Sequence, residues 1–515
     1  MKENTNKAIA INTVYLYVRL VFNAVSMLFC TRFALEAMGV DDFGLYSVLG
    51  SIVSFMGIMN TIMLSTSNRF IAVAIGKGND KLVNSQLNVS IAIHVAIAFL
   101  TIIIALTFGS WYIYRYVNYD GDINLAYQVF TWSVIGSALS FLSVPYNGLL
   151  MAKEKFSVFC VTDILVHAGK MLVAFSLCYC FENRLLVYAA ALAVLTATPA
   201  LVYMFYCARH YPEFTHLYLV RDSQMYKEVF SFSVWIGYGA VATIGRMQAG
   251  ALLVNAFFNT AMNAALGIAN QINSLIVLFC NNVSQPIAPQ VTKNYISGNR
   301  ERCFRLLVFN TKISYLTVLF VSMPFLLEPE WILTLWLGNV PEYVVPFMTL
   351  IVIDTLVGAI NAGVSNLFFA NGNIRAYQLA INTLRIIAVL TAYFVLKAGN
   401  PAHSLFYTYI AFTVINFFIV QYLLRKVLDF DTLLLIKGSY FPSILVTLLF
   451  LPMILIKHYL NPIALLVISA TFLAVLIYYV GLNRNEKDMA VSLMEKLTCK
   501  LKSNSYVLKR GSKQQ

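Results

Sequence analysis

About 14 apolar segments follow one another along this chain, each near the length that crossing a bilayer core requires. Only 11% of the 515 residues are charged, whereas a soluble domain carries about 25%. A soluble globule of this size needs a polar surface, so this apolar surface must face lipid. We therefore predict an all-α polytopic membrane protein with spans at 8–31, 43–74, 84–113, 124–151, 157–180, 185–207, 229–256, 261–292, 306–328, 343–370, 376–396, 403–424, 438–456 and 461–482.

The basic residues are distributed unevenly between the two ends of these spans. With the N-terminus in the cytoplasm, 25 of the 36 Lys and Arg residues fall at cytoplasmic ends and loops, five fall outside and six lie within spans. The positive-inside rule produces this bias for an even number of spans with both termini cytoplasmic. Much of the formal charge of +13 thus reflects topology, and we do not expect nucleic acid as a partner.

Two short matches relate the first half of the chain to the second. Gly78-Asn79 matches Gly298-Asn299, and MAKEKF at 151–156 matches FANGNI at 369–374. Six spans per half is an even number, so the pattern indicates a parallel repeat of two six-helix bundles about a pseudo-two-fold axis along the membrane normal. We predict an N-terminal half (1–207), a cytoplasmic linker (208–228), a C-terminal half (229–430), two additional helices (431–482) and a basic cytoplasmic tail (483–515).

Charged residues inside the spans are mostly cations. The two acids are Asp163 and Asp354, and the six bases are Arg19, Arg69, Lys170, Arg246, Lys312 and Arg385. Intramembrane charges are costly and usually face a bundle interior or a wet cavity. For Arg69 and Lys312, near predicted cytoplasmic ends, snorkelling to the headgroups is an equal alternative.

Uncharged polar residues follow single helical faces within several spans. They either bond neighbouring helices or line a polar cavity. In the tenth span, Asp354, Asn361 and Ser365 are spaced to share one face. The candidates for contacting a polar ligand are Asn23, Asn270, Asn281, Gln285 and Asn361.

The fifth predicted span carries Asp163, His167 and Lys170 at i, i+4 and i+7. This spacing places all three on one helical face. The group is either a charge-neutralising cluster or a titrating relay, since a buried Asp or His can change protonation during transport. Asp163, His167 and Asp354 are therefore the candidates for ion coupling.

Motifs of soluble enzymes do not occur in the sequence. It has no Walker loop, no nucleophile elbow and no paired catalytic carboxylates in a loop, and its cysteines and histidines form no ligand pattern. We expect a secondary transporter or facilitator, with no catalytic residues, metal site or cofactor.

Three motifs resemble one membrane-transport superfamily. They are MGVDDFGLYSVL (Met38–Leu49), NAALGIANQINS (Asn263–Ser274) and NNVSQPIAPQVTK (Asn281–Lys293). Together with the two six-helix halves, they resemble the polysaccharide flippases (Wzx type, for O-antigen or capsule repeat units) of the multidrug/oligosaccharidyl-lipid/polysaccharide exporter superfamily. The resemblance covers the first twelve spans.

This resemblance implies translocation of a polyprenyl-diphosphate-linked oligosaccharide from the cytoplasmic to the periplasmic leaflet of the bacterial inner membrane. The implied partners are the lipid-linked oligosaccharide, the bilayer, a polysaccharide polymerase and glycosyltransferases. Arginines in a low-dielectric cavity suit a diphosphate. We expect Arg19, Arg69, Arg246 and Arg385 to contact it with Lys170, and the asparagines and Gln285 to contact the sugar.

Two other functions remain open at this point. A cation-coupled multidrug exporter of the same superfamily would use buried acids, of which this chain has two against six bases. A membrane-embedded glycan polymerase or ligase would need a large outer catalytic loop, and the longest predicted outer loop is short, at 328–342.

Overall fold

The computed structural model describes residues 2–488 except 120, 154, 181, 285, 286, 288, 289, 292, 293, 296, 372, 373 and 485. Helices make up its secondary structure, and no strand occurs within this part of the chain. The α-helices are α1 (Lys2–Met56), α2 (Ile58–Gly76), α3 (Asp80–Ile104), α4 (Ser110–Tyr116), α5 (Ile123–Phe141), α6 (Ser143–Ala152), α7 (Phe156–Cys180), α8 (Arg184–His210), α9 (Ser223–Phe257), α10 (Thr260–Ser284), α12 (Arg300–Leu327), α13 (Pro329–Leu337), α14 (Val344–Ala359), α15 (Val364–Asn371), α16 (Ile374–Lys397), α17 (Ser404–Leu428), α18 (Thr432–Leu435), α19 (Phe441–Phe450), α20 (Met453–Ile456) and α21 (Pro462–Leu476). The π and 3-10 segments are η1 (Ala105–Gly109), η2 (Pro212–Phe214), η3 (Ile436–Tyr440), η4 (Lys457–Tyr459) and η5 (Ile477–Gly481).

Twelve helical segments in the described residues are long and apolar enough to cross a membrane. Two more helices, α2 and α9, occupy the predicted second and seventh spans, and α2 is apolar over the shorter stretch 62–75. The first predicted span and the beginning of the second lie in the long helix α1, which is interrupted by Gly39 in the left-handed region (φ 80°); α2 holds the rest of the second span. The chain is an all-α polytopic membrane protein, as predicted.

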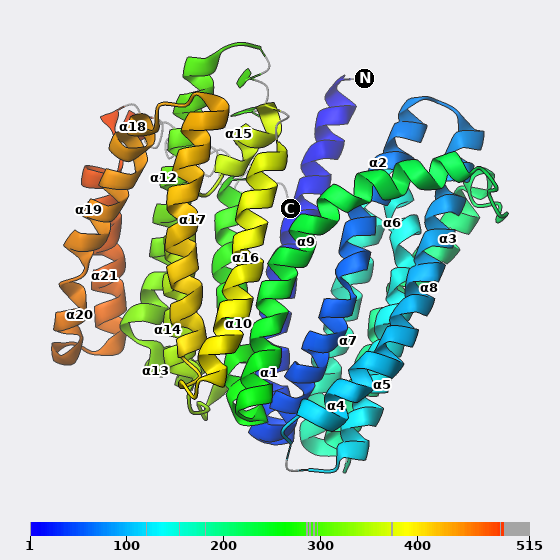
Figure 1. Cartoon of the computed structure of the whole chain (residues 1–515), viewed down its shortest axis with the longest axis horizontal. Helices are drawn as coiled ribbons and strands as arrows, with labels where there is room; N and C mark the ends of the chain where they lie inside the picture. The colour runs from blue at the N-terminus through cyan, green and yellow to red at the C-terminus, as the bar shows by residue number, and fades with distance from the viewer. Residues whose placement is uncertain are drawn as a thin grey trace, which may run out of the picture. The chain divides into compact units, whose positions relative to one another are not determined.

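The chain divides into two compact units that are not contiguous in sequence. Unit 1 comprises 1–275, 332–354 and 375–419, and unit 2 comprises 276–331, 355–374 and 420–515. Within unit 1, α1 packs along α7, α5 along α8, and α9 against both α1 and α2 (Figure 1). Within unit 2, α12 packs against α19 and α21 (Figure 1). The predicted division into two symmetry-related halves stays a prediction.

Helices α1 and α10 of unit 1 come into backbone contact near the start of α10. A Cβ atom on Gly44 would lie 2.0 Å from the Thr260 carbonyl oxygen, and one on Gly267 would lie 2.7 Å from the Ser47 hydroxyl. At Gly44 only glycine permits such an approach, because the opposing atoms belong to the backbone and van der Waals contacts are normally 3.4 Å or more; at Gly267 the Ser47 hydroxyl can rotate away. Ser47 and Gly267 belong to two of the motifs that carry the family resemblance.

A buried ion pair joins the C-terminal segment to α12 within unit 2. Lys312 is 2% exposed, and its ammonium donates to Glu486 at 2.5 Å. Glu486 also accepts the backbone N–H of Asn483 at 2.8 Å. Of the two alternatives for Lys312, snorkelling to the headgroups is therefore wrong, because a carboxylate from beyond the last predicted span neutralises the ammonium inside the protein.

The short sequence match between the two halves is a match of local structure. Gly78 and Gly298 both adopt positive φ (64° and 77°). The asparagine after each one caps the next helix: Asn79 accepts the Leu82 N–H at 3.1 Å, and Asn299 accepts the Arg302 N–H at 3.2 Å. A glycine that reverses the chain, followed by an N-cap, thus starts both α3 and α12.

Candidate functional site

Helices α1 and α7 bring together the first group of predicted site residues, which we call the α1–α7 cluster: Arg19, Asn23, Asp163, His167 and Lys170. The Arg19 Nε donates to Asp163 Oδ2 at 2.5 Å, and the Asn23 amide donates to the same oxygen at 2.6 Å. Arg19 and Asn23 lie one turn apart on α1, so both reach one carboxylate. His167 and Lys170 follow Asp163 on the same face of α7.

An aromatic ring also supports the Arg19 guanidinium. Its central carbon lies 4.3 Å from the ring centroid of Phe159, which is one turn before Asp163 on α7. The Arg19 and Asp163 side chains are 29% and 21% exposed. The pair is therefore mostly covered by protein but still partly accessible. The Asn23 Oδ1 is buried and has no hydrogen-bond partner among the described residues.

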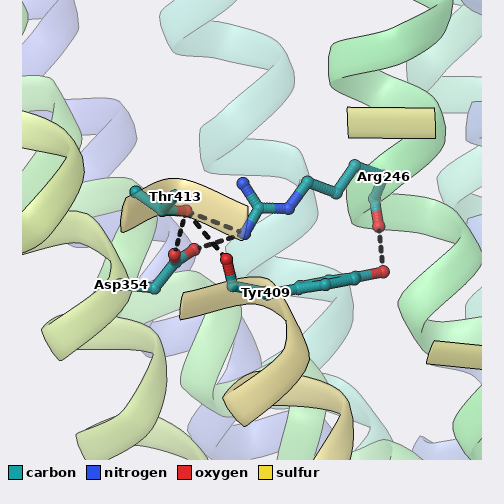
Figure 2. Close-up of polar contacts among 4 residues, drawn as sticks. All are labelled: Arg246, Asp354, Tyr409 and Thr413. Atoms are coloured by element: carbon teal, nitrogen blue, oxygen red, sulfur yellow. Dashed lines mark hydrogen bonds and ion pairs between the residues drawn. The ribbon is translucent and has the colours of Figure 1, made fainter. Parts of the chain in front are cut away.

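A second group, the α9–α14 cluster, contains Arg246, Asp354, Arg385, Tyr409 and Thr413. Arg246 Nη2 donates to Asp354 Oδ2 at 2.7 Å, and the Thr413 hydroxyl donates to Asp354 Oδ1 at 2.5 Å (Figure 2). The Arg246 guanidinium lies 4.4 Å from the Tyr409 ring centroid, and the Tyr409 hydroxyl donates to the Arg246 carbonyl at 3.0 Å. This cluster repeats the chemistry of the first one, with an arginine, an aspartate and an aromatic ring.

Each cluster holds one more cation that lacks a carboxylate partner within the described chain. Arg385 donates to the Thr243 hydroxyl at 2.7 Å and to Asn382 Oδ1 at 3.0 Å, and Thr243 lies one turn before Arg246 on α9. Lys170 forms no hydrogen bond or ion pair with any described residue. With His167 neutral, each cluster therefore contains two cations and one carboxylate, a net charge of +1.

The other predicted site residues lie elsewhere. Arg69 is exposed on α2, and its guanidinium is near the Phe70 ring. Asn270 is half-buried on α10, and Asn281 is exposed near the end of that helix. In unit 2, Asn361 accepts hydrogen bonds from Gln421 and Tyr440 at 3.2 and 3.1 Å. Gln285 lies outside the described residues.

The tenth predicted span is not one continuous helix. It is interrupted by a turn at 360–363 between α14 and α15, so the prediction of one uninterrupted polar face from Asp354 through Asn361 to Ser365 is wrong. Gly363 has φ 80°, and a Cβ there would overlap the Asn310 amide nitrogen, so only glycine can occupy this site. Asn361 lies in this turn.

Sequence reasoning did not identify several supporting residues. Phe159, Tyr409 and Thr413 hold the two ion pairs in place, and Thr243 and Asn382 hold Arg385. Tyr409 and Thr413 are one turn apart on one predicted helix, and this spacing could have indicated a shared polar face. Nothing in a single sequence, however, connects them to Arg246.

One cavity of about 270 Å³ lies apart from both clusters. It is lined by Val40, Asn259, Ala261, Met262, Pro341, Glu342 and Tyr343. It contains none of the predicted site residues.

Comparisons with known proteins yield matches at the level of structure. No family model matches the chain, and no curated protein sequence matches it. A MATE-family multidrug resistance transporter of the MOP superfamily, in an inward-facing conformation, aligns with a TM-score of 0.66 at 14% identity over 79% of this chain and 97% of its own. The lipid II flippase MurJ, in an inward closed conformation, aligns with a TM-score of 0.66 at 13% identity over 90% of this chain and 99% of its own.

A third solved structure, a ligand complex of the MATE multidrug transporter DinF-BH, aligns with a TM-score of 0.58 at 14% identity over 82% of this chain and 97% of its own. At these identities the likeness establishes the fold. All three matches extend over nearly the full length of the known protein. The chain is therefore a multi-pass membrane protein with the fold that MATE transporters share with the MurJ flippase.

Proposed function

We propose that this protein is a flippase that moves a polyprenyl-diphosphate-linked oligosaccharide from the cytoplasmic to the periplasmic leaflet by alternating access. Its cargo would serve the synthesis of a cell-surface polysaccharide such as O-antigen or capsule. The observation that carries this proposal is the surplus of cations in the two clusters. Cations without carboxylates are costly inside a membrane, and an anionic ligand would balance them.

The guanidinium groups suit a diphosphate better than ammonium groups would. Arginine presents several N–H donors in a planar fork that matches two phosphate oxygens. A lipid diphosphate esterified at both ends is a dianion, and its two negative charges would balance the combined net charge of +2 on the two clusters. In this proposal Arg19, Arg246 and Arg385 contact the diphosphate, Lys170 assists, and Arg69 meets it near the cytoplasmic leaflet.

The neutral amides are assigned to the sugar. Asn23 has a buried carbonyl oxygen that a sugar hydroxyl can satisfy, and burying such a group without a partner costs about 1–3 kcal/mol. Asn270, Asn281, Asn361 and Gln285 remain proposed sugar contacts. The inner membrane, with both termini cytoplasmic, remains the proposed location, with a polymerase and glycosyltransferases as partners.

Transport of a fluorescent lipid-linked oligosaccharide across proteoliposomes tests the proposal. Arg385→Ala is the most informative substitution, because Arg385 has no carboxylate partner that its loss would strand. We expect transport to fall at least about tenfold while the protein remains folded. Arg305→Ala is the matched control, since that arginine is 69% exposed and, within the described part of the chain, pairs only with Glu301 on its own helix. Full transport by Arg385→Ala, Arg19→Lys and Arg246→Lys would exclude this role.

A cation-coupled multidrug exporter is the second candidate, favoured by the likeness to MATE transporters. Two of the three compared structures are multidrug transporters. A cationic drug needs an accessible carboxylate, and in this chain both membrane aspartates are covered by arginines. Resistance to cationic drugs on expression, without accumulation of lipid-linked oligosaccharide on loss of the protein, would favour this alternative.

A further inference from the structure

In each of the two arginine–aspartate pairs, the geometry would let a phosphate take the place of the aspartate. Each pair is joined by one hydrogen bond between the charged groups, through Nε of Arg19 or Nη2 of Arg246. Beyond Thr413, which also accepts from Nη2 at 3.4 Å, neither guanidinium has another hydrogen-bond partner in the described chain. Most of the donors of each arginine thus remain unused, although a guanidinium binds two oxygens in parallel when geometry allows.

Each guanidinium also has support that does not depend on its aspartate. Arg19 lies over Phe159 and Arg246 over Tyr409, at 4.3 and 4.4 Å from the ring centroids. A cation over an aromatic face is attracted to it. The arginines can therefore keep their positions when the carboxylates move away.

Each aspartate likewise has a neutral partner of its own. Asp163 accepts from Asn23 at 2.6 Å, and Asp354 accepts from Thr413 at 2.5 Å. These donors would continue to satisfy the carboxylates after the arginines turn to another anion. Such partners matter because a buried carboxylate without hydrogen bonds is very costly.

From these three observations we infer that Asp163 and Asp354 are internal competitors of the substrate. In the empty protein they occupy Arg19 and Arg246, and the diphosphate displaces them when it binds. The inference rests on the proposed function and adds a regulatory role for the aspartates. Pairing of the arginines with the aspartates limits the net charge of the two clusters when no substrate is bound. Return of the aspartates to the arginines then promotes release of the lipid.

Binding of farnesyl diphosphate to the purified protein in nanodiscs tests this inference. Asp163→Asn and Asp354→Asn keep the size of each side chain and one acceptor oxygen, but they remove the competing charge. We expect each variant to bind at least about fivefold more tightly, the effect of losing one modest ion-pair competitor. The matched control is Asp122→Asn, because Asp122 caps α5 by accepting the Asn124 N–H at 2.9 Å, and asparagine caps a helix equally well.

A double-mutant cycle separates displacement from a general gain in positive charge. If Asp163 competes for Arg19, the gain from Asp163→Asn disappears in an Arg19→Gln background. A gain that persists there would come from the long-range field and would overturn the inference. Transport provides a second readout: the Asp→Asn variants should bind more tightly yet transport more slowly, whereas a purely structural role would weaken both.

The possible failures are distinguishable. If neither the wild-type protein nor any variant binds farnesyl diphosphate, the proposed substrate class is wrong. If the wild-type protein binds it and both Asp→Asn variants bind equally or less tightly, the substrate class stands and the competition is refuted.

Discussion

Replacing Gly44 with alanine tests the contact between α1 and the start of α10. The added methyl carbon would lie 2.0 Å from the Thr260 carbonyl oxygen, 2.7 Å from its carbon and 3.3 Å from the Ala264 nitrogen. The nearest atoms belong to backbone and cannot rotate away. The helices must separate by more than about 1 Å to restore ordinary contact.

The cost of this substitution follows from the contact distances. Overpacking a well-packed site typically costs about 1–3 kcal/mol. If alternating access requires this contact to open, the same energy would shift the equilibrium between closed and open forms by about 5- to 150-fold toward the open form. Gly50→Ala is the matched control, because Gly50 lies on the same helix and a Cβ there meets no atom within 4 Å.

Labelling of a single cysteine measures the opening. Thr260 is 3% exposed, and Thr260→Cys leaves the critical carbonyl in place. In a variant without the native cysteines, we expect Gly44→Ala to increase the rate of reaction with a membrane-impermeant maleimide at least about fivefold. Gly50→Ala should leave the rate unchanged. An unchanged rate in folded Gly44→Ala, or an equal increase in both variants, would refute the reasoning.

Three further predictions concern stability, each measured by unfolding of the purified protein in detergent. Lys312→Met should cost about 3–5 kcal/mol because it strands the Glu486 carboxylate, and the double variant with Glu486→Met should recover most of this loss; equal stability of the single and double variants would contradict the ion pair. Asn299→Ala should cost about 1 kcal/mol through loss of the N-cap, whereas Asn299→Asp should be neutral. Burial and the nearby Asp42 carboxylate, to which the Tyr119 hydroxyl donates at 2.5 Å, raise the pKa of Tyr119. The contribution of this residue to folding stability is therefore complete below a pH of about 10. It is lost as the pH rises through the raised pKa. Tyr119→Phe should flatten that alkaline limb, and an unchanged limb would exclude Tyr119 as its source.

Apolar segment length was a sound guide to the helices, because a membrane requires each span to satisfy its own backbone hydrogen bonds. The Gly-Asn match also reported real structure, since a positive-φ glycine and an N-cap are local features that neighbouring residues determine. The break at Gly363 was not predictable in the same way. The Asn310 side chain that packs against Gly363 comes from a different helix, α12, so a local pattern does not reveal this contact.

The charged clusters were only partly predictable for a related reason. The rarity of charge in the spans identified all four arginines and lysines of the clusters and both aspartates. The pairing of Arg19 with Asp163 and of Arg246 with Asp354 joins residues 144 and 108 positions apart. One sequence contains no signal for such pairs. The cation surplus also looked larger than it is, because Glu486, the partner of Lys312, lies outside the predicted spans.

Two of the motifs that suggested the superfamily have a physical explanation. Ser47 lies in the first motif and Gly267 in the second, and the two residues meet where α1 and α10 touch. The motif residues therefore reflect a requirement for close helix packing, a property of the fold. This explains why the motifs point to the fold more directly than to a substrate.

The ion pair between Lys312 and Glu486 imposes an order on biosynthesis. The two residues are 174 positions apart, so α12 leaves the ribosome long before its counter-ion has been made. Until then the lysine has to reach the headgroups or water along its own flexible stem. Snorkelling thus describes the nascent chain, and synthesis of the last segment allows the ammonium to be drawn inside. The segment after η5 thus supplies the charge that lets α12 keep a lysine buried within unit 2.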